Sequence, residues 1–232
     1  MTSDPIIVEF VGLPGVGKST LSRRVAGELS GSQSRVTEPT WHIDNRSGPY
    51  RILSKSRFVT EHTFLRPRIA LPLVPILSST NQATLSDLVR VGFNLQYVAG
   101  VMARTRRNPG VTILDQGPYQ GVWSVGFRSS ADWNSLFDRF DGFLSRTAPD
   151  LVVLVEADTE TIEERLHSRE DGDTRFSPDT PEFDRGVDGY DSLKRLIHSI
   201  DSHESIVVEN ETYADLDRGV DRVVAAVESL HD

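Results

Sequence analysis

The segment Ile6–Leu21 has the residue types and the spacing that can hold a chain of phosphate groups. It reads IIVEFVGLPGVGKSTL. Gly12, Gly17, Lys18 and Ser19 fit the phosphate-binding pattern G-x-x-x-x-G-K-[ST]. The pattern predicts a nucleotide-binding loop formed by Gly12, Leu13, Pro14, Gly15, Val16, Gly17, Lys18, Ser19 and Thr20.

The residue types of this loop suggest how it binds a nucleotide. Gly12, Gly15 and Gly17 lack a Cβ, so the backbone can take a positive φ and come close to a ligand. Successive N–H groups then surround an anion. Lys18 is expected to reach the β- and γ-phosphates, and the Ser19 hydroxyl to bind Mg²⁺. ATP and Mg²⁺ are therefore the expected cofactors.

Two carboxylates follow predicted strands. Asp115 comes directly after the apolar run Val111–Leu114, where it would hold Mg²⁺ together with Ser19 during phosphoryl transfer. Glu38 ends the short strand candidate Arg35–Glu38 and could accept a proton from the group that is phosphorylated. The alternative for each is an ordinary acidic residue at a solvated turn.

Three arginines flank a polar, glycine-containing segment at 169–182. Arg165 and Arg169 are spaced i, i+4 for one helix face, and Arg175 follows inside the segment. We expect a mobile lid whose arginines stabilise the γ-phosphate in the transition state. The alternative is a helix face on which these arginines form salt bridges with neighbouring glutamates.

Apolar runs alternate with helical patterns along the whole chain. Five strands are predicted at 6–11, 35–38, 111–114, 151–155 and 205–208, each followed by at least one helix. This alternation predicts a parallel sheet built from right-handed βαβ units, flanked by helices on both faces: the P-loop NTPase fold. We expect a single domain over residues 1–232, with an acceptor-side insertion at about 41–107.

Several predictions concern this insertion and the helices after it. We expect a loop at Trp41–Arg51, a short helix at Ile52–Phe64, and an irregular apolar segment at Arg66–Thr80, because three prolines interrupt it. A long helix at Asn81–Arg107 has apolar residues at helical spacing. The remaining helices are predicted at 119–127, 133–146, 158 onward, 183–200 and 213–230.

A basic cluster ends the long helix, at Arg104, Arg106 and Arg107. Basic residues in a last turn favour the helix dipole, so these side chains could serve only as a cap. They could also hold a phosphate group of an acceptor.

Composition excludes several classes of protein. The formal net charge is −9 and the pI about 5.2, which argues against a broad nucleic-acid surface. There is no cysteine, so thiol chemistry and disulfides are excluded. The apolar run Leu71–Leu77 is too short to cross a bilayer. We expect a cytoplasmic protein whose partner is a small-molecule acceptor, with no nucleic acid or membrane partner; a homodimer is compatible with these features.

Five motifs resemble the thymidylate kinase-like group of P-loop kinases, which includes deoxynucleoside kinases. They are GLPGVGKST, VTEP with Trp41, LDQG at Leu114–Gly117, RLHSREDGDTRF and FDRGVDGYDSL. The resemblance implies that Glu38 serves as base for a 5′-hydroxyl, and that Trp41 and Gln116 face the acceptor.

The chain departs from the family at two of these positions. Gln116 stands where the family has an arginine, and Gly117 where thymidylate kinases usually have a tyrosine. The resemblance implies an ATP-dependent kinase for a nucleoside or a nucleoside monophosphate. A kinase for a sugar, an antibiotic or another metabolite remains an alternative, as does a regulatory NTPase switch.

Overall fold

In the computed structural model, which describes residues 4–31, 35–40, 48–65, 67–127, 129–168, 176–200 and 203–230, strands alternate with helices. The strands are β1 (Pro5–Val11), β2 (Val36–Thr37), β3 (Gly110–Leu114), β4 (Leu151–Glu156) and β5 (Glu204–Glu209). The helices are α1 (Lys18–Gly31), α3 (Gly48–Leu65), α4 (Pro67–Ser78), α5 (Leu85–Thr105), α6 (Pro118–Gly126), α7 (Trp133–Thr147), α8 (Thr159–His167), α9 (Pro181–His198) and α10 (Tyr213–Ser229).

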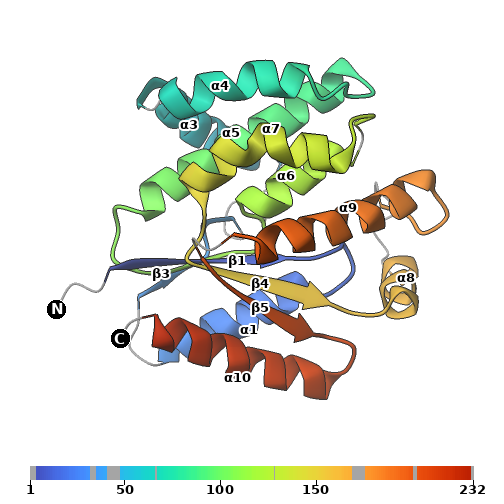
Figure 1. Ribbon diagram of the computed structural model, residues 1–232. Helices are drawn as coiled ribbons and strands as arrows, with labels where there is room; N and C mark the ends of the chain where they lie inside the picture. Colours follow the sequence, from blue (N-terminus) through green and yellow to red (C-terminus); the bar gives the residue numbers. More distant parts are fainter. Residues whose placement is uncertain are drawn as a thin grey trace.

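The strands form one parallel sheet in the order β2-β3-β1-β4-β5. Helices α1 and α10 cover one face, and α5, α6, α7 and α9 cover the other, with α3 and α4 farther out (Figure 1). The predicted five-stranded parallel sheet with helices on both faces is therefore confirmed. Because all strands run in one direction, their carboxyl ends share one edge of the sheet.

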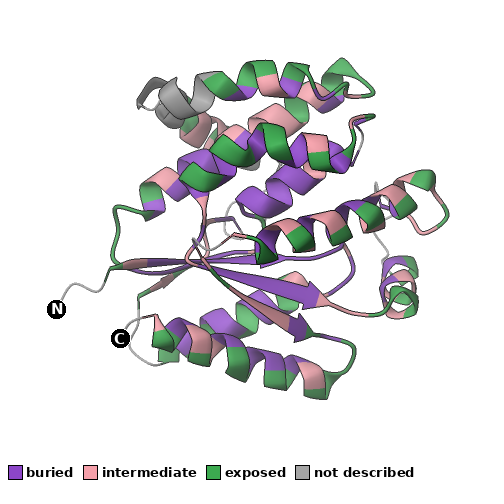
Figure 2. Cartoon of the chain, viewed as in Figure 1, coloured by how far each residue is buried: buried purple, intermediate pink, exposed green. Residues whose placement is uncertain are grey.

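The core follows from burial of the central strands on both faces (Figure 2). Helix α1 adds Leu21, Val25 and Leu29, spaced four residues apart on its buried stripe. Glu9 interrupts the apolar run of β1 and is nevertheless completely buried, with 0% exposure.

The prediction of an irregular segment at Arg66–Thr80 is wrong, because Pro67–Ser78 forms helix α4. Proline in a helix interior removes a hydrogen bond and costs about 3 kcal/mol. Here Pro72 and Pro75 lie on the exposed side of the helix, while Leu73 and Leu77 are buried on the other side.

Two other boundaries differ from expectation. The loop predicted at Trp41–Arg51 is too long, since α3 begins at Gly48. The long helix begins later than predicted, at Leu85 after the N-cap Thr84. The apolar stripe of that helix is only partly buried, because Leu85 is 75% exposed, whereas Leu95 is buried.

The Trp133 ring at the start of α7 packs between helices α6 and α9. A Cβ on Gly126 of α6 would lie 1.9 Å from this ring, and a Cβ on Gly189 of α9 would lie 2.1 Å from it. Both glycines are therefore needed where the ring is inserted between the two helices.

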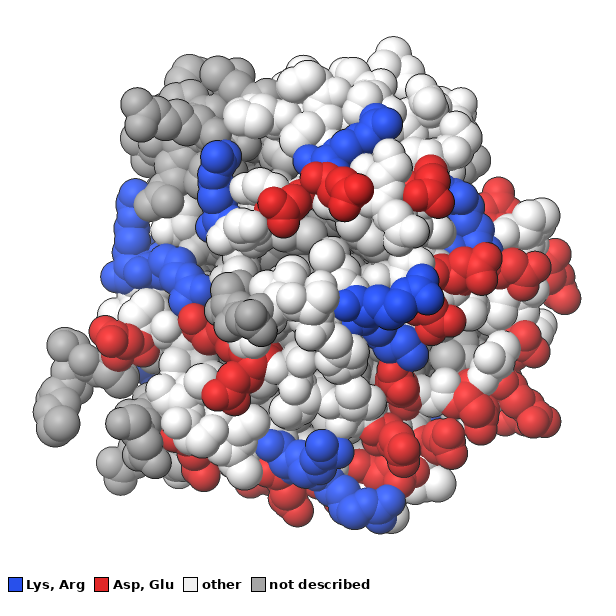
Figure 3. Space-filling view, in the orientation of Figure 1, with Lys and Arg blue, Asp and Glu red and all other residues white. Residues whose placement is uncertain are grey.

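Charge is distributed unevenly on the surface. Acidic side chains gather at the right of the molecule, over the ends of α8, α9 and α10 (Figure 3). Within the described part of the chain, no helix is both long and apolar enough to cross a bilayer.

Candidate functional site

The loop between β1 and α1 has the backbone that its glycines predict at two of three positions. Gly15 and Gly17 have φ values of 93° and 94°. Gly12 is required for a different reason, since a Cβ there would lie 2.6 Å from the Val155 carbonyl oxygen. Gly12 thus lets the loop pack against the end of β4, without the positive φ that we expected.

The loop divides its side chains between the core and a cavity of about 320 Å³. Leu13 and Val16 are buried in the core, so they can offer a ligand only backbone groups. The loop residues that line the cavity are Pro14, Gly15, Gly17, Lys18, Ser19 and Thr20.

The ammonium group of Lys18 curls back over the loop. Its Nζ donates to the Gly12 and Leu13 carbonyl oxygens at 2.6 and 2.9 Å. The charge therefore lies at the loop's centre, next to the cavity where a phosphate chain would bind.

Three side chains from other elements hold the loop's backbone. Gln120 of α6 accepts from the Gly12 N–H at 3.1 Å, and Asn210 after β5 donates to the Val16 carbonyl oxygen at 2.7 Å. Arg165 of α8 donates to the Val16, Asn210 and Glu211 carbonyl oxygens at 3.3, 2.9 and 3.0 Å. The loop is therefore connected to α6, α8 and β5 at once.

Arg165 is the one predicted lid arginine within the described residues. Its guanidinium binds carbonyl oxygens beside the loop, and within this part of the chain it forms no ion pair with a neighbouring carboxylate. Helix α8 ends at His167. Arg169 itself and Arg175 lie outside the described residues.

The second half of the predicted lid is better anchored than its polar sequence suggests. Phe176 is 4% exposed and packs against Trp123 and Phe183, at centroid distances of 6.0 and 4.7 Å. Helix α9 then begins at Pro181. Phe176 therefore anchors the described end of the segment predicted as a lid.

Asp115 lies next to Ser19 in the lining of the cavity. The Ser19 hydroxyl donates to one carboxylate oxygen at 3.5 Å, and the buried Thr40 hydroxyl donates to the other at 2.8 Å. These oxygen ligands suit Mg²⁺, which uses one or two carboxylates together with substrate phosphates. Among the described residues, no group of three His, Cys, Asp or Glu side chains could hold a metal alone. A metal at Ser19 and Asp115 would therefore need phosphate ligands as well.

Helices α5 and α6 provide the other wall of the cavity. Gln116, between β3 and α6, also lines it. Sequence reasoning missed the remaining lining residues of these helices, which are Asn94, Gln120, Gly121, Trp123 and Ser124.

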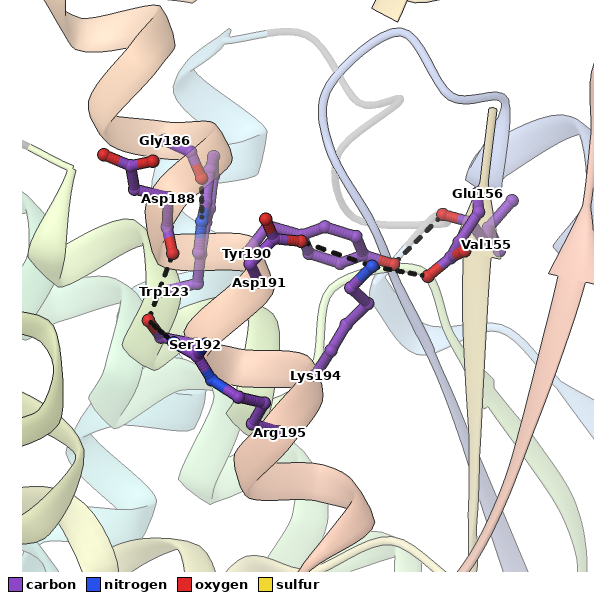
Figure 4. Close-up of polar contacts among 10 residues, drawn as sticks. All are labelled: Trp123, Val155, Glu156, Gly186, Asp188, Tyr190, Asp191, Ser192, Lys194 and Arg195. Carbon is purple, nitrogen blue, oxygen red and sulfur yellow. Dashed lines mark hydrogen bonds and ion pairs between the residues drawn. The ribbon is translucent and has the colours of Figure 1, made fainter. Parts of the chain in front are cut away.

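Helix α9 holds this wall and the end of β4 in place (Figure 4). The Trp123 Nε1 donates to the Gly186 carbonyl oxygen at 3.0 Å, and the Tyr190 hydroxyl donates to that of Val155 at 3.2 Å. Lys194 forms an ion pair with Glu156 at 3.0 Å (Figure 4). The Val155 carbonyl is the group against which Gly12 packs, so α9 supports the loop from behind.

Of the remaining predicted residues, those that the structure describes do not line the cavity. Glu38 is half-buried after β2 and does not line it, although Thr40, two residues later, binds Asp115. Trp41 lies outside the described residues. Arg106 of the basic cluster binds Asp150 just before β4, at the opposite edge of the sheet, at 2.7 Å.

Comparison with known proteins agrees with this architecture. A protein-family model described as an AAA domain matches residues 7–193. The chain belongs to this family. A search of curated proteins found no match.

Several solved structures share the fold of this AAA-domain protein. Thymidylate kinase from Candida albicans aligns with a TM-score of 0.57 at 17% identity, covering 100% of this chain and 96% of that one. Deoxyadenosine kinase from M. mycoides, with products dCMP and dCDP bound, aligns with a TM-score of 0.58 at 12% identity, covering 97% and 100%. The resemblance to thymidylate and deoxynucleoside kinases is thus confirmed at the level of the fold.

Proposed function

We propose that this protein is an ATP-dependent phosphotransferase that moves the γ-phosphoryl group of ATP to a small acceptor, most readily a nucleoside or a nucleoside monophosphate. One observation carries the proposal. The phosphate loop and Asp115 share a single cavity with Asn94, Trp123 and Ser124, which lie on helices outside the nucleotide-binding loop. A site that only bound and hydrolysed a nucleotide would not need this second, helix-lined wall.

In this proposal, residues of the loop and its neighbours bind the phosphate chain and Mg²⁺. The N–H groups around Gly15 and Gly17 and the Lys18 ammonium would hold the phosphate chain. Ser19 and Asp115 would hold Mg²⁺, which neutralises charge that develops during phosphoryl transfer. Thr40 would keep the Asp115 carboxylate turned toward Ser19.

The reaction would join an acceptor oxygen to the γ-phosphorus and break the bond between that phosphorus and the bridging oxygen of ADP. A hydroxyl acceptor loses its proton in this step, and Glu38 is the proposed base. Glu38 would then have to turn toward the cavity when the acceptor binds. Lys18 and the arginines at 165, 169 and 175 would stabilise the charge on the transferring group.

The acceptor class rests on the resemblance together with the cavity. The solved structures of similar fold are named as kinases of thymidylate and deoxyadenosine. The proposed acceptor contacts are Gln116, Trp41 and the helix wall at Asn94 and Trp123. An aromatic side chain beside amide groups suits a flat, hydrogen-bonding base.

A screen of acceptors tests the proposal. Purified protein is incubated with Mg·ATP and one of a set of nucleosides, nucleoside monophosphates, sugars and small alcohols, and ADP is measured. We expect ADP formation that depends on a nucleoside or its monophosphate, and a phosphorylated product by mass spectrometry. ADP release that is the same with and without every acceptor would instead indicate an NTPase switch, and dependence on a sugar or another metabolite would change the acceptor class.

A further inference from the structure

Glu9 is an unusual residue for the centre of a parallel sheet. It lies in β1 between Leu114 of β3 and Val152 of β4 and is 0% exposed. Burying a carboxylate costs several kcal/mol unless hydrogen bonds replace its water. Its position therefore has to be explained by its partners.

The partners of Glu9 are the first backbone N–H groups of α6. One carboxylate oxygen accepts from the Gln120 N–H at 2.9 Å, and the other accepts from the Tyr119 N–H at 3.2 Å. Burial raises the pKa of Glu9 to about 8, against the opposing effect of the backbone N–H groups at the start of α6. The N-cap position, Gly117, offers no side chain of its own. The carboxyl group of Glu9 thus caps α6 as a hydrogen-bond acceptor, from a strand far away in the sequence.

Gly117 makes this arrangement sterically possible. A Cβ at this position would lie 2.4 Å from the carboxyl carbon of Glu9. Any larger residue at 117 would therefore displace the buried carboxylate from the end of the helix.

The capped end of α6 touches the catalytic cavity in two ways. Gln120, whose N–H binds Glu9, uses its side-chain oxygen to accept from the Gly12 N–H at 3.1 Å. Asp115, two residues before Gly117, accepts the Ser19 hydroxyl. The buried Glu9 side chain therefore supports, through the N-terminus of α6, both the phosphate loop and Asp115.

We propose that Glu9 is a positioning residue, which fixes the N-terminus of α6 so that Gln120 holds the phosphate loop and Asp115 faces Ser19. Its effect on nucleotide binding is independent of what the acceptor is; its effect on turnover rests on the proposed phosphotransferase function. Displacement of reacting groups by about 1 Å can cost 10²-fold in rate, so small shifts of α6 matter.

Glu9→Gln tests this role in the full-length protein. The amide keeps the shape but turns an N–H₂ group toward a backbone N–H donor, so one hydrogen bond is lost. We expect the Kd for Mg·ADP to rise about tenfold, kcat to fall about 10- to 100-fold, and the Mg²⁺ concentration for half-maximal rate to rise, because Asp115 is no longer held. A structural role alone would lower the melting temperature without changing the Mg²⁺ requirement.

Thr112→Val is the matched control. Thr112 is 4% exposed on the neighbouring strand β3, and within the described residues its hydroxyl bonds only to Thr37 of β2, at 2.9 Å. This variant also loses a partly buried hydrogen bond, but it should keep wild-type Mg·ADP affinity and Mg²⁺ dependence. If Thr112→Val weakened Mg·ADP binding and raised the Mg²⁺ requirement as much as Glu9→Gln does, the proposal would be overturned.

Gln120→Leu keeps the test decisive should Glu9→Gln fail to fold. It removes the bond to Gly12 and leaves the cap intact, so Mg·ADP affinity should fall here too. In the double variant the losses should be smaller than the two single losses combined, because both act through one contact. Wild-type Mg·ADP affinity in folded Glu9→Gln, or in Gln120→Leu when the former cannot be made, would contradict the proposal. A wild-type protein that binds Mg·ADP but phosphorylates no acceptor would refute the kinase function. The comparison of Mg·ADP affinity between wild type and these variants would still test the role of Glu9.

Discussion

Lys18 contributes to the loop in two ways. Its ammonium bonds to two loop carbonyls and also brings positive charge to the cavity. Lys18→Ala should lower kcat by about 10² to 10³, the usual loss when a donor to a developing charge is removed. Circular dichroism should show an unchanged fold.

Arg24→Ala is the control for Lys18→Ala. Arg24 is a cation on the same helix, pairs with Asp217 on the surface at 2.6 Å, and should not affect turnover. Near-normal turnover by folded Lys18→Ala would remove the phosphate loop from the proposed mechanism.

Glu38 distinguishes the two acceptor classes. A hydroxyl acceptor needs a base, whereas a phosphate monoester is already largely anionic at pH 7. Glu38→Gln should therefore lower kcat by about 10² to 10⁴ for a nucleoside and flatten the acidic limb of the pH–rate profile. With a monophosphate acceptor the change should be mild and mainly in KM. Unchanged kcat, KM and pH profile on the best acceptor would exclude Glu38 from the site.

Glu9 should make stability depend on pH. Burial raises its pKa from 4.5 to about 8, so the folded protein binds this proton more tightly than the unfolded chain. The contribution of Glu9 is complete below about pH 4.5 and is lost as the pH rises through about 8, with a slope of at most about 1.4 kcal/mol per pH unit.

Urea unfolding from pH 5 to pH 9 measures this effect. Burial lowers the pKa of His203, which makes stability rise with pH in its own range. The difference between wild type and Glu9→Gln therefore isolates the glutamate. That difference should change steadily up to about pH 8, and a constant difference would mean that Glu9 does not titrate in this range.

At the scale of elements, the contact of α6 and α9 with the Trp133 ring has a measurable cost. In Gly189→Ala the new methyl group would lie 2.1 Å from the ring, so we expect a loss of about 1–3 kcal/mol in the free energy of unfolding. Gly142→Ala on α7 is the control, because nothing lies within 4 Å of its new methyl group. The free energy of unfolding of Gly142→Ala should rise by about 0.5–1 kcal/mol. Equal effects of the two substitutions would contradict the packing described for Trp133.

The elements show what local sequence can and cannot predict. The helix predicted from residue 158 onward is capped by Asp158, which accepts from the Thr161 N–H at 2.6 Å; such caps are predictable because they depend on neighbouring residues. Helix α4 was missed because its stability depends on how Leu73 and Leu77 pack, which outweighs the unfavourable Pro72 and Pro75.

At the scale of the whole molecule, a ligand should stabilise the fold, because the phosphate loop is held by α6, α8 and β5 together. At 100 times its Kd, Mg·ADP should add about 2.7 kcal/mol. This corresponds to a rise of about 5–10 °C in melting temperature for a chain of this size. Lys18→Ala should show little or no rise at the same concentration. A similar rise in both proteins would place the nucleotide elsewhere.

The site as a whole was only partly predictable. The loop residues and Asp115 could be found because each belongs to a local pattern of strand and turn. Asn210 offers a similar signal, since it directly follows β5, but it was not recognised. Asn94 and Gln120 give no such signal, because only the packing of α5 and α6 brings them to the cavity.

The fit between Glu9 and Gly117 also has a consequence for inheritance. The two positions share one volume, so a lineage that acquires a side chain at 117 has to shorten or move the residue at 9. Substitutions at these positions should thus be inherited as pairs. A relative with tyrosine at position 117 should lack glutamate at position 9. The residue types at these two positions would then distinguish subgroups of the family.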